Sequence, residues 1–313
     1  MSAGLHAHGP RGRPIGRGDP RQPFVAALAV TIGLMAVEAI GGWLTGSLAL
    51  VADAGHLLVD VGTLGLGCVA SWLAARPATA RMSYGYRRAE ILAAVTNGVA
   101  LWAVAGAIVY EAIARLRTPH AVSAPGMLVV ALLGLAGNLA ASAVLAPGRE
   151  ENLNLRVAFT HILADAAAAV GTIAASLVIL TTGWTRADAV AGVAIAALIF
   201  AGSWPLLREA VQILMEGTPH RLSLFEVEEA MRGVSGVVNV HDLHIWSLTS
   251  GVEAVSGHVL IADGRESQRV LADLCRLLNT RYGLGHVTLQ VEDEAFLDSG
   301  HPNCTPRAGT TFG

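Results

Sequence analysis

Two histidine and aspartate pairs lie in apolar segments of this sequence at the same spacing. His56 precedes Asp60 by four residues, and His161 precedes Asp165 by four residues. On a helix, residues i and i+4 lie on one face with Cβ atoms about 6 Å apart, so each pair directs one imidazole nitrogen and one carboxylate oxygen toward a common point. Two such helices packed face to face form a tetrahedral set of two nitrogens and two oxygens, which Zn²⁺ accepts.

The charge of this four-residue group favours a metal ion that exchanges with protons. One divalent cation, two carboxylates and two neutral imidazoles sum to zero in a medium that penalises net charge. Without metal, the group reaches the same neutrality by binding two protons. Because imidazole titrates near neutral pH, metal and protons compete for the same atoms. The alternative for each pair is a buried hydrogen bond that braces the helices, but the repeated spacing favours the metal site.

The segments that carry these pairs are predicted to be membrane helices. Of the 313 residues, 53% are hydrophobic and 14% are charged, whereas about 25% are charged in ordinary soluble domains; this argues against a soluble enzyme. Six apolar stretches each exceed the roughly 20 residues that cross a bilayer. They cover residues 24–45, 48–75, 90–114, 124–146, 157–182 and 187–207. We therefore predict a membrane α-helical fold, with a six-helix transmembrane bundle over residues 24–211.

Arginines indicate the orientation of the predicted bundle, because cytoplasmic loops retain positive charge and the sequence contains no lysine. On the opposite side of the predicted bundle lie only Arg115, Arg117 and Arg186. Ten others lie before the first helix, between the second and third, and between the fourth and fifth: Arg11, Arg13, Arg17, Arg21, Arg76, Arg81, Arg87, Arg88, Arg149 and Arg156. We expect both termini in the cytoplasm of a multi-pass protein in a bacterial inner membrane. The arginines form no basic stripe with interleaved aromatic residues, so no nucleic-acid partner is expected.

Other polar residues at membrane depth are expected to hydrogen-bond between helices or to lie near helix ends. They are Glu38, Asp53, Glu111, Asn138 and Asp188.

Beyond about residue 212 the composition becomes that of a soluble domain. The hydrophobic pattern predicts a helix over 223–233, strands over 237–247 and 252–262, a helix over 266–282 and a strand over 286–292. This order is typical of a small α+β domain with its helices on one face of a sheet, and we place that domain at residues 212–296. The flanking residues 1–23 and 297–313 are expected to form disordered tails.

Several motifs, in the same order along the chain, resemble those of the cation diffusion facilitator family, in its zinc-exporting branch. The resemblance covers about residues 24–296 and rests on Glu38 with Gly41 and Gly42, and on the segments GSLALVADAGHLLVD (46–60), SYGYRRAEILAA (83–94), NLNLRVAFTHILAD (152–165) and VHDLHIWSL (240–248). It implies a homodimer in which each protomer has six membrane helices and a ferredoxin-like, metallochaperone-like cytoplasmic domain. It also implies a transport site formed by His56, Asp60, His161 and Asp165.

The resemblance extends to the histidines of the C-terminal domain. His241 and His258 match family positions that bind regulatory metal, and His286 with Glu292 resembles a later pair of ligands. The alternative is a solvated polar face of the sheet. His244 alternates differently from His241 along a regular strand, so we expect it to pack or hydrogen-bond elsewhere. Four residues of the tails are weaker candidates for metal ligands: His6, His8, His301 and Cys304.

Together these features predict a proton-coupled antiporter that exports Zn²⁺, and also Cd²⁺ or Co²⁺, from the cytoplasm by alternating access. Such a protein serves metal homeostasis and resistance, with Zn²⁺ as transported substrate and as regulatory ligand of the cytoplasmic domain. We expect no organic cofactor and no enzymatic activity, because no HExxH element occurs and no GxSxG element accompanies a base. A membrane protein that senses metal without transporting it would use the same ligands, so a transport assay distinguishes the exporter from the sensor.

Overall fold

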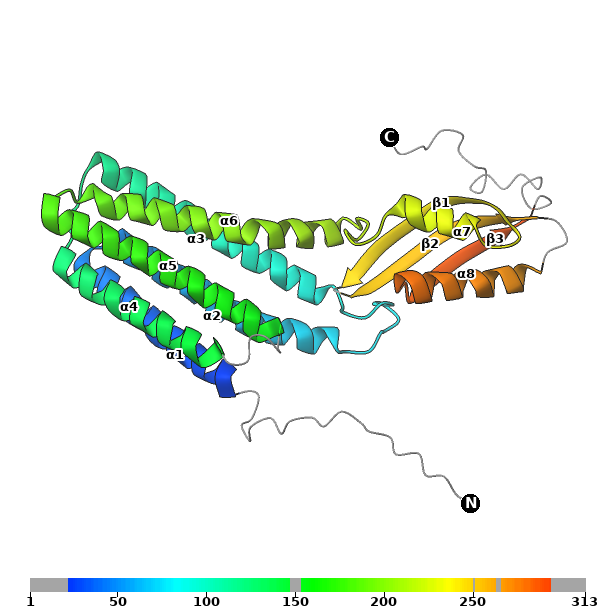
Figure 1. Ribbon diagram of the computed structural model, residues 1–313, viewed down its shortest axis with the longest axis horizontal. Helices are drawn as coiled ribbons and strands as arrows, with labels where there is room; N and C mark the ends of the chain where they lie inside the picture. The colour runs from blue at the N-terminus through cyan, green and yellow to red at the C-terminus, as the bar shows by residue number, and fades with distance from the viewer. Residues whose placement is uncertain (1–21, 147–152, 250, 263–265, 294–313) are drawn as a thin grey trace, which may run out of the picture. The chain divides into compact units, whose positions relative to one another are not determined.

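The computed structural model describes residues 22–146, 153–249, 251–262 and 266–293, in which six long helices precede an α+β domain (Figure 1). The six helices are α1 (Gln22–Thr45), α2 (Leu48–Ala74), α3 (Ala89–Arg117), α4 (Ala124–Leu145), α5 (Leu153–Thr182) and α6 (Arg186–Leu214). Each is long and apolar enough to cross a membrane. The predicted membrane α-helical class is therefore confirmed.

Helix α6 continues past its predicted end at residue 207. Ser203, Leu207 and Ala210 are buried at helical spacing, whereas Arg208 and Glu209 are exposed on the opposite side. The helix therefore continues with one buried face, although Arg208 and Glu209 interrupt the apolar stretch on which the predicted end was based.

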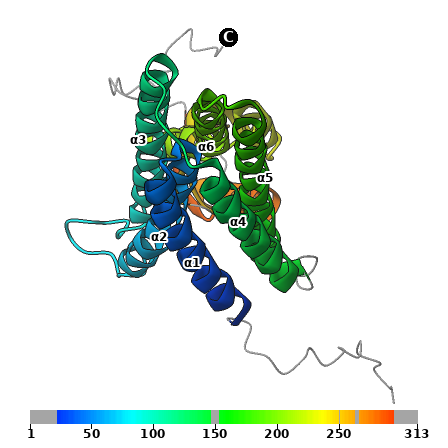
Figure 2. The same ribbon diagram turned by 90° about the vertical axis from the view of Figure 1, so that its left-hand side faces the viewer.

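The chain divides into two compact units. One is formed by Met1–Leu58 and Glu111–Ile195, and the other by Val59–Tyr110 and Ala196–Gly313. In the first unit, α4 lies between α1 and α5, as Figures 1 and 2 show.

Small residues allow the close approach of α1 and α4. A Cβ atom added at Gly41 of α1 would lie 2.6 Å from Cγ2 of Val130 on α4. A Cβ atom added at Gly134 of α4 would lie 2.6 Å from Oε1 of Glu38 on α1. Membrane helices commonly pack through such small residues, and here Gly134 also leaves room for the buried carboxyl group of Glu38.

The C-terminal domain has the predicted α-β-β-α-β order. Its elements are α7 (Leu224–Arg232), β1 (Val237–Thr249), β2 (Val252–Ile261), α8 (Ser267–Tyr282) and β3 (His286–Glu292). The strand order is β1-β2-β3, with β1 and β2 antiparallel and β2 and β3 parallel. Apolar residues of α7 and α8 share one core with residues of the strands, among them Met231, Leu274, Val255 and Val259. The helices therefore cover one face of the sheet.

A bulge in β1 changes which side chains share the other face. His241 pairs with His258 and His244 pairs with Ser256, so β1 advances three residues where β2 advances two. Asp242 within this bulge has a φ of 51°, a left-handed conformation that is uncommon outside glycine. Because cross-strand partners share a face, His241 and His244 lie on the same side. We expected these two histidines to point to opposite faces of the sheet. This prediction was wrong, because it assumed a regular strand without the bulge.

Candidate metal centres

The first unit contains a group of three potential metal ligands: His56 from α2, and His161 and Asp165 from α5. One ligand atom from each lies within 4.8 Å of the other two. Nε2 of His56 is 3.8 Å from Oδ1 of Asp165, and Nε2 of His161 is 3.8 Å from Oδ2 of the same residue. One carboxylate therefore faces two imidazole rings, with a different oxygen toward each.

These separations suit an ion better than direct hydrogen bonds. Ligand atoms that surround Zn²⁺ tetrahedrally at about 2.0 Å lie about 3.3 Å apart, whereas hydrogen bonds between nitrogen and oxygen seldom exceed about 3.2 Å. Asp165 is 6% exposed, and a carboxylate so buried requires a compensating positive charge. A cation bound between this carboxylate and the two imidazoles would supply such a charge.

Two features of the sequence predicted that these three residues would meet. His161 and Asp165 are four residues apart on α5, so one helical face presents both side chains. His56 comes from a different helix, and its ring centroid lies 5.6 Å from that of His161. The repeated HxxxD spacing predicted this meeting of α2 and α5.

Asp60 was the fourth predicted ligand. It follows His56 by one turn of α2 and is half-buried. The division between the two units falls between Leu58 and Val59, so Asp60 belongs to the second unit and is not one of the three grouped residues. Its role as a ligand remains a prediction.

Glu38 is a buried acid for which only a structural role was expected. Its side chain is 1% exposed, and its Oε2 atom makes no hydrogen bond within the described part of the chain. Buried polar atoms without a partner are rare in proteins, and acids at membrane depth are commonly functional. Two sequence signals marked it: its depth in the apolar segment, and its place with Gly41 and Gly42 among the motifs that carry the family resemblance.

The second unit contains a further group on the face of the sheet opposite α7 and α8: His241 of β1, His258 of β2 and Glu292 of β3. Glu292 is 1% exposed. Its Oε1 lies 2.6 Å from Nδ1 of His258, and its Oε2 lies 3.1 Å from Nε2 of His241. At these distances the carboxylate is hydrogen-bonded to both imidazoles. A bound Zn²⁺ would replace these hydrogen bonds with bonds to two imidazole nitrogens and one carboxylate oxygen, a donor set known from zinc sites.

Strand register explains why these three residues meet. His241 is directly opposite His258, and Glu292 is opposite Leu260, two residues along β2 from His258. All three side chains therefore point to the same face. Gln290, opposite His258, donates a hydrogen bond of 2.9 Å from Nε2 to Oε1 of Glu292 and so helps to orient the carboxylate.

The other histidines of this domain lie outside the group. His286 is six residues before Glu292 on β3, which corresponds to about 20 Å along an extended strand, so the structure does not bring this predicted pair together. The exposed His286 ring instead packs edge-on against Tyr84, with centroids 5.4 Å apart. His244 lies 3.1 Å from Asp242 through its Nε2 atom. The tail candidates His6, His8, His301 and Cys304 lie outside the described residues.

Comparison with known proteins gives matches over nearly the whole chain. Residues 24–215 match a family model described as the cation efflux transmembrane domain, and residues 219–294 match one described as the cation efflux protein, cytoplasmic domain. A cadmium, cobalt and zinc/H⁺-K⁺ antiporter of Bacillus subtilis is 38% identical, over 93% of this chain and 94% of that protein. The zinc transporter ZitB of Escherichia coli is 36% identical, over 92% of each chain. A solved metal-bound C-terminal domain of the CzcD transporter from Cuprividus metallidurans is 38% identical and covers 23% of this chain and 99% of that one, with a TM-score of 0.22.

Proposed function

The chain belongs to the cation diffusion facilitator family of cation efflux proteins, and we propose that it is a proton-coupled antiporter that exports Zn²⁺ from the cytoplasm. The observation that carries the proposal is the buried Asp165 carboxylate between the imidazoles of His56 and His161. Nitrogen and oxygen donors also accept Cd²⁺ and Co²⁺, and the name of the Bacillus subtilis relative includes both metals.

Competition for the same atoms couples the metal to protons. A lone pair on Nε2 of each imidazole binds either Zn²⁺ or a proton, so metal entry releases protons and proton entry releases metal. With Asp60 as the fourth ligand, two carboxylates balance the charge of the dication. The group is then neutral with either cargo, which lowers the cost of reorienting it within an apolar bundle.

Transport also requires that the ligands face each side of the membrane in turn. We propose alternating access of a homodimer, with both termini in the cytoplasm and the protein in the bacterial inner membrane. The arginines of the N-terminal segment and of the connections between α2 and α3 and between α4 and α5 support this orientation. The matched cytoplasmic-domain model supports the same placement of the C-terminal domain.

The C-terminal domain is proposed to respond to the metal that the bundle exports. His241, His258 and Glu292 would hold the ion, and bound Zn²⁺ would link three strands through one centre. Because it binds the ordered sheet more tightly than an opened one, the metal stabilises the domain as the concentration of free zinc rises. The fraction of the domain with an ordered sheet would then depend on the concentration of cytoplasmic zinc, as regulation of export by zinc requires.

Zinc uptake into proteoliposomes tests the proposal. Purified protein is reconstituted, a pH gradient is imposed, and zinc is followed with a trapped fluorescent chelator. We expect gradient-dependent flux in the wild type, and its loss in Asp165→Asn protein that still elutes as a folded dimer. Ser176→Ala is the matched control, since Ser176 is buried on the same helix and bonds to the backbone oxygen of Thr172; its flux should match the wild type.

Two outcomes would contradict the proposal. Flux in Asp165→Asn equal to the wild type would remove this residue from the transport site. Zinc binding without flux in a folded wild-type protein would favour a metal sensor. Repeating the assay with K⁺ replaced by choline separates exchange with protons alone from exchange that also uses K⁺, the ion included in the name of the Bacillus subtilis relative.

A further inference from the structure

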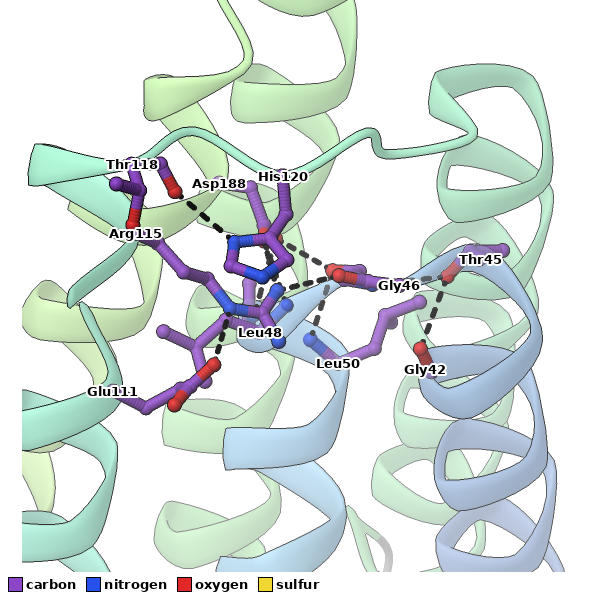
Figure 3. A network of polar contacts seen from close by, with 12 residues as sticks. Gly42, Thr45, Gly46, Leu48, Leu50, Glu111, Arg115, Thr118, His120 and Asp188 are labelled. Carbon is purple, nitrogen blue, oxygen red and sulfur yellow. Dashed lines mark hydrogen bonds and ion pairs between the residues drawn. The ribbon is translucent and has the colours of Figure 1, made fainter.

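A buried carboxylate from α6 caps the first turn of α2. Asp188 is 1% exposed. Its Oδ1 accepts hydrogen bonds from the Ser47 hydroxyl at 2.6 Å and from the backbone N–H of Ala49 at 3.1 Å, and its Oδ2 accepts one from the backbone N–H of Leu48 at 2.6 Å (Figure 3). Residues about 140 positions apart in the sequence therefore form one helix cap.

This cap differs from the usual local one. The first N–H groups of a helix lack partners within it, and a Ser or Asp directly before the helix commonly accepts from them. Ser47 does so for the N–H of Leu50, at 3.2 Å, but the N–H groups of Leu48 and Ala49 depend on Asp188. Because these acceptors belong to another helix, the cap fixes the start of α2 to the start of α6.

Arg115 near the end of α3 completes the network. Its guanidinium donates from NH1 to the backbone oxygen of Gly46 at 2.5 Å and lies 3.6 Å from Oδ2 of Asp188. Its Nε donates to Oε1 of Glu111 at 2.9 Å. Figure 3 shows the Arg115 side chain beside Asp188 and the corner before α2. The buried negative charge is thus balanced, and α2, α3 and α6 are held at one point.

We propose that Asp188 is a positioning residue for the metal group: by fixing the first turn of α2, it sets the place of His56 relative to Asp165. His56 follows Leu48 by eight residues, about 12 Å along a helix. Between them Ala49, Leu50 and Ala52 are at most 1% exposed, so this part of α2 is packed and transmits a change at its start. The inference rests on the proposed function, since it assigns a role toward the transported ion.

Asp188→Asn tests this role. The amide has nearly the same shape but one acceptor oxygen and one donor group, so it cannot accept from Ser47, Leu48 and Ala49 together. We expect the dissociation constant of Zn²⁺ at the bundle to rise about tenfold, the lower end of the range seen when a group that orients a metal ligand is replaced. The KM for zinc flux should rise by a similar factor while the maximal rate changes less than about twofold.

Ser47→Ala provides a graded second variant. It removes one hydrogen bond to Asp188 and leaves both backbone bonds, so the dissociation constant should rise less than in Asp188→Asn. Both variants are compared by calorimetry on full-length protein that also carries Glu292→Gln, which weakens the second metal centre. Ser176→Ala again serves as the control for loss of a buried hydroxyl.

The outcomes separate positioning from a merely structural role. A cap that only stabilises the fold would lower the melting temperature and leave the dissociation constant within about twofold of its original value in both folded variants; this result would overturn the proposal. If Asp188→Asn does not fold, Ser47→Ala decides in the same way. If the wild type binds zinc without transporting it, the proposed function fails, while the calorimetric comparison still decides the role of Asp188.

Discussion

Replacing Glu292 by Gln is expected to remove most of the metal affinity of the C-terminal domain. The change keeps the size and shape of a side chain that is 1% exposed, so the sheet retains its packing. It removes the negative charge that faces Nδ1 of His258 at 2.6 Å and Nε2 of His241 at 3.1 Å. The two imidazoles then remain as ligands beside a neutral amide.

The magnitude follows from the charge that is lost. A hydrogen bond to a charged group contributes about 1.5–3 kcal/mol to protein stability. The contact of a bound Zn²⁺ with the carboxylate is expected to contribute at least the upper end of this range, about 3 kcal/mol, to the free energy of binding. A loss of about 3 kcal/mol corresponds to roughly a hundredfold rise in the dissociation constant. We therefore expect Glu292→Gln to weaken zinc binding at this centre by a factor of about 100.

The assay is titration calorimetry of full-length protein that carries Asp165→Asn, so that the bundle contributes little binding. Glu253→Gln is the matched control. Glu253 is a buried acid of the same sheet, 8% exposed, but its carboxylate pairs with Arg221 at 2.9 Å. Its replacement should lower stability and leave the zinc affinity unchanged. Equal zinc affinity in Glu292→Gln and Glu253→Gln would refute the assignment of this centre.

Two further predictions concern packing and His286. Gly41→Ala places a methyl group against Val130, and we expect a loss of about 1–3 kcal/mol in unfolding free energy, typical of overpacking; Gly33→Ala, where no atom lies within 4 Å, should change it little. Denaturation in detergent measures both, and equal stabilities would show that α1 and α4 separate at little cost. His286→Ala should leave zinc affinity at the C-terminal centre within about twofold, because β3 carries the residue about 20 Å from Glu292; a tenfold loss in calorimetry would place His286 among its ligands.

Features set by residues close together in the sequence were easier to predict than contacts between residues far apart in it. Apolar length predicted six membrane helices, and the four-residue spacing predicted that His161 and Asp165 share a face, because both depend on neighbours in sequence. The meeting of His56 with Asp165 followed from one repeated pattern. The bulge at Asp242 had no comparable signal, so the face of His244 was mispredicted.

The cap on α2 shows the limit of such reasoning most clearly. Ser47 precedes the helix and is the residue that a local cap would use, yet two backbone N–H groups bind Asp188 from a helix about 140 residues later. The sequence placed Asp188 near a helix end but contained no spacing that relates it to α2. Tertiary packing alone determines that contact.

Proton release on zinc binding tests the central claim most directly, namely that one set of groups binds either metal or protons. Zinc is added to weakly buffered, full-length protein carrying Glu292→Gln, and a pH indicator reports the protons released per ion bound. We predict release of about one to two protons per zinc near neutral pH, and its loss together with tight binding in the variant that also carries Asp165→Asn. Tight zinc binding at the bundle without proton release would contradict the account.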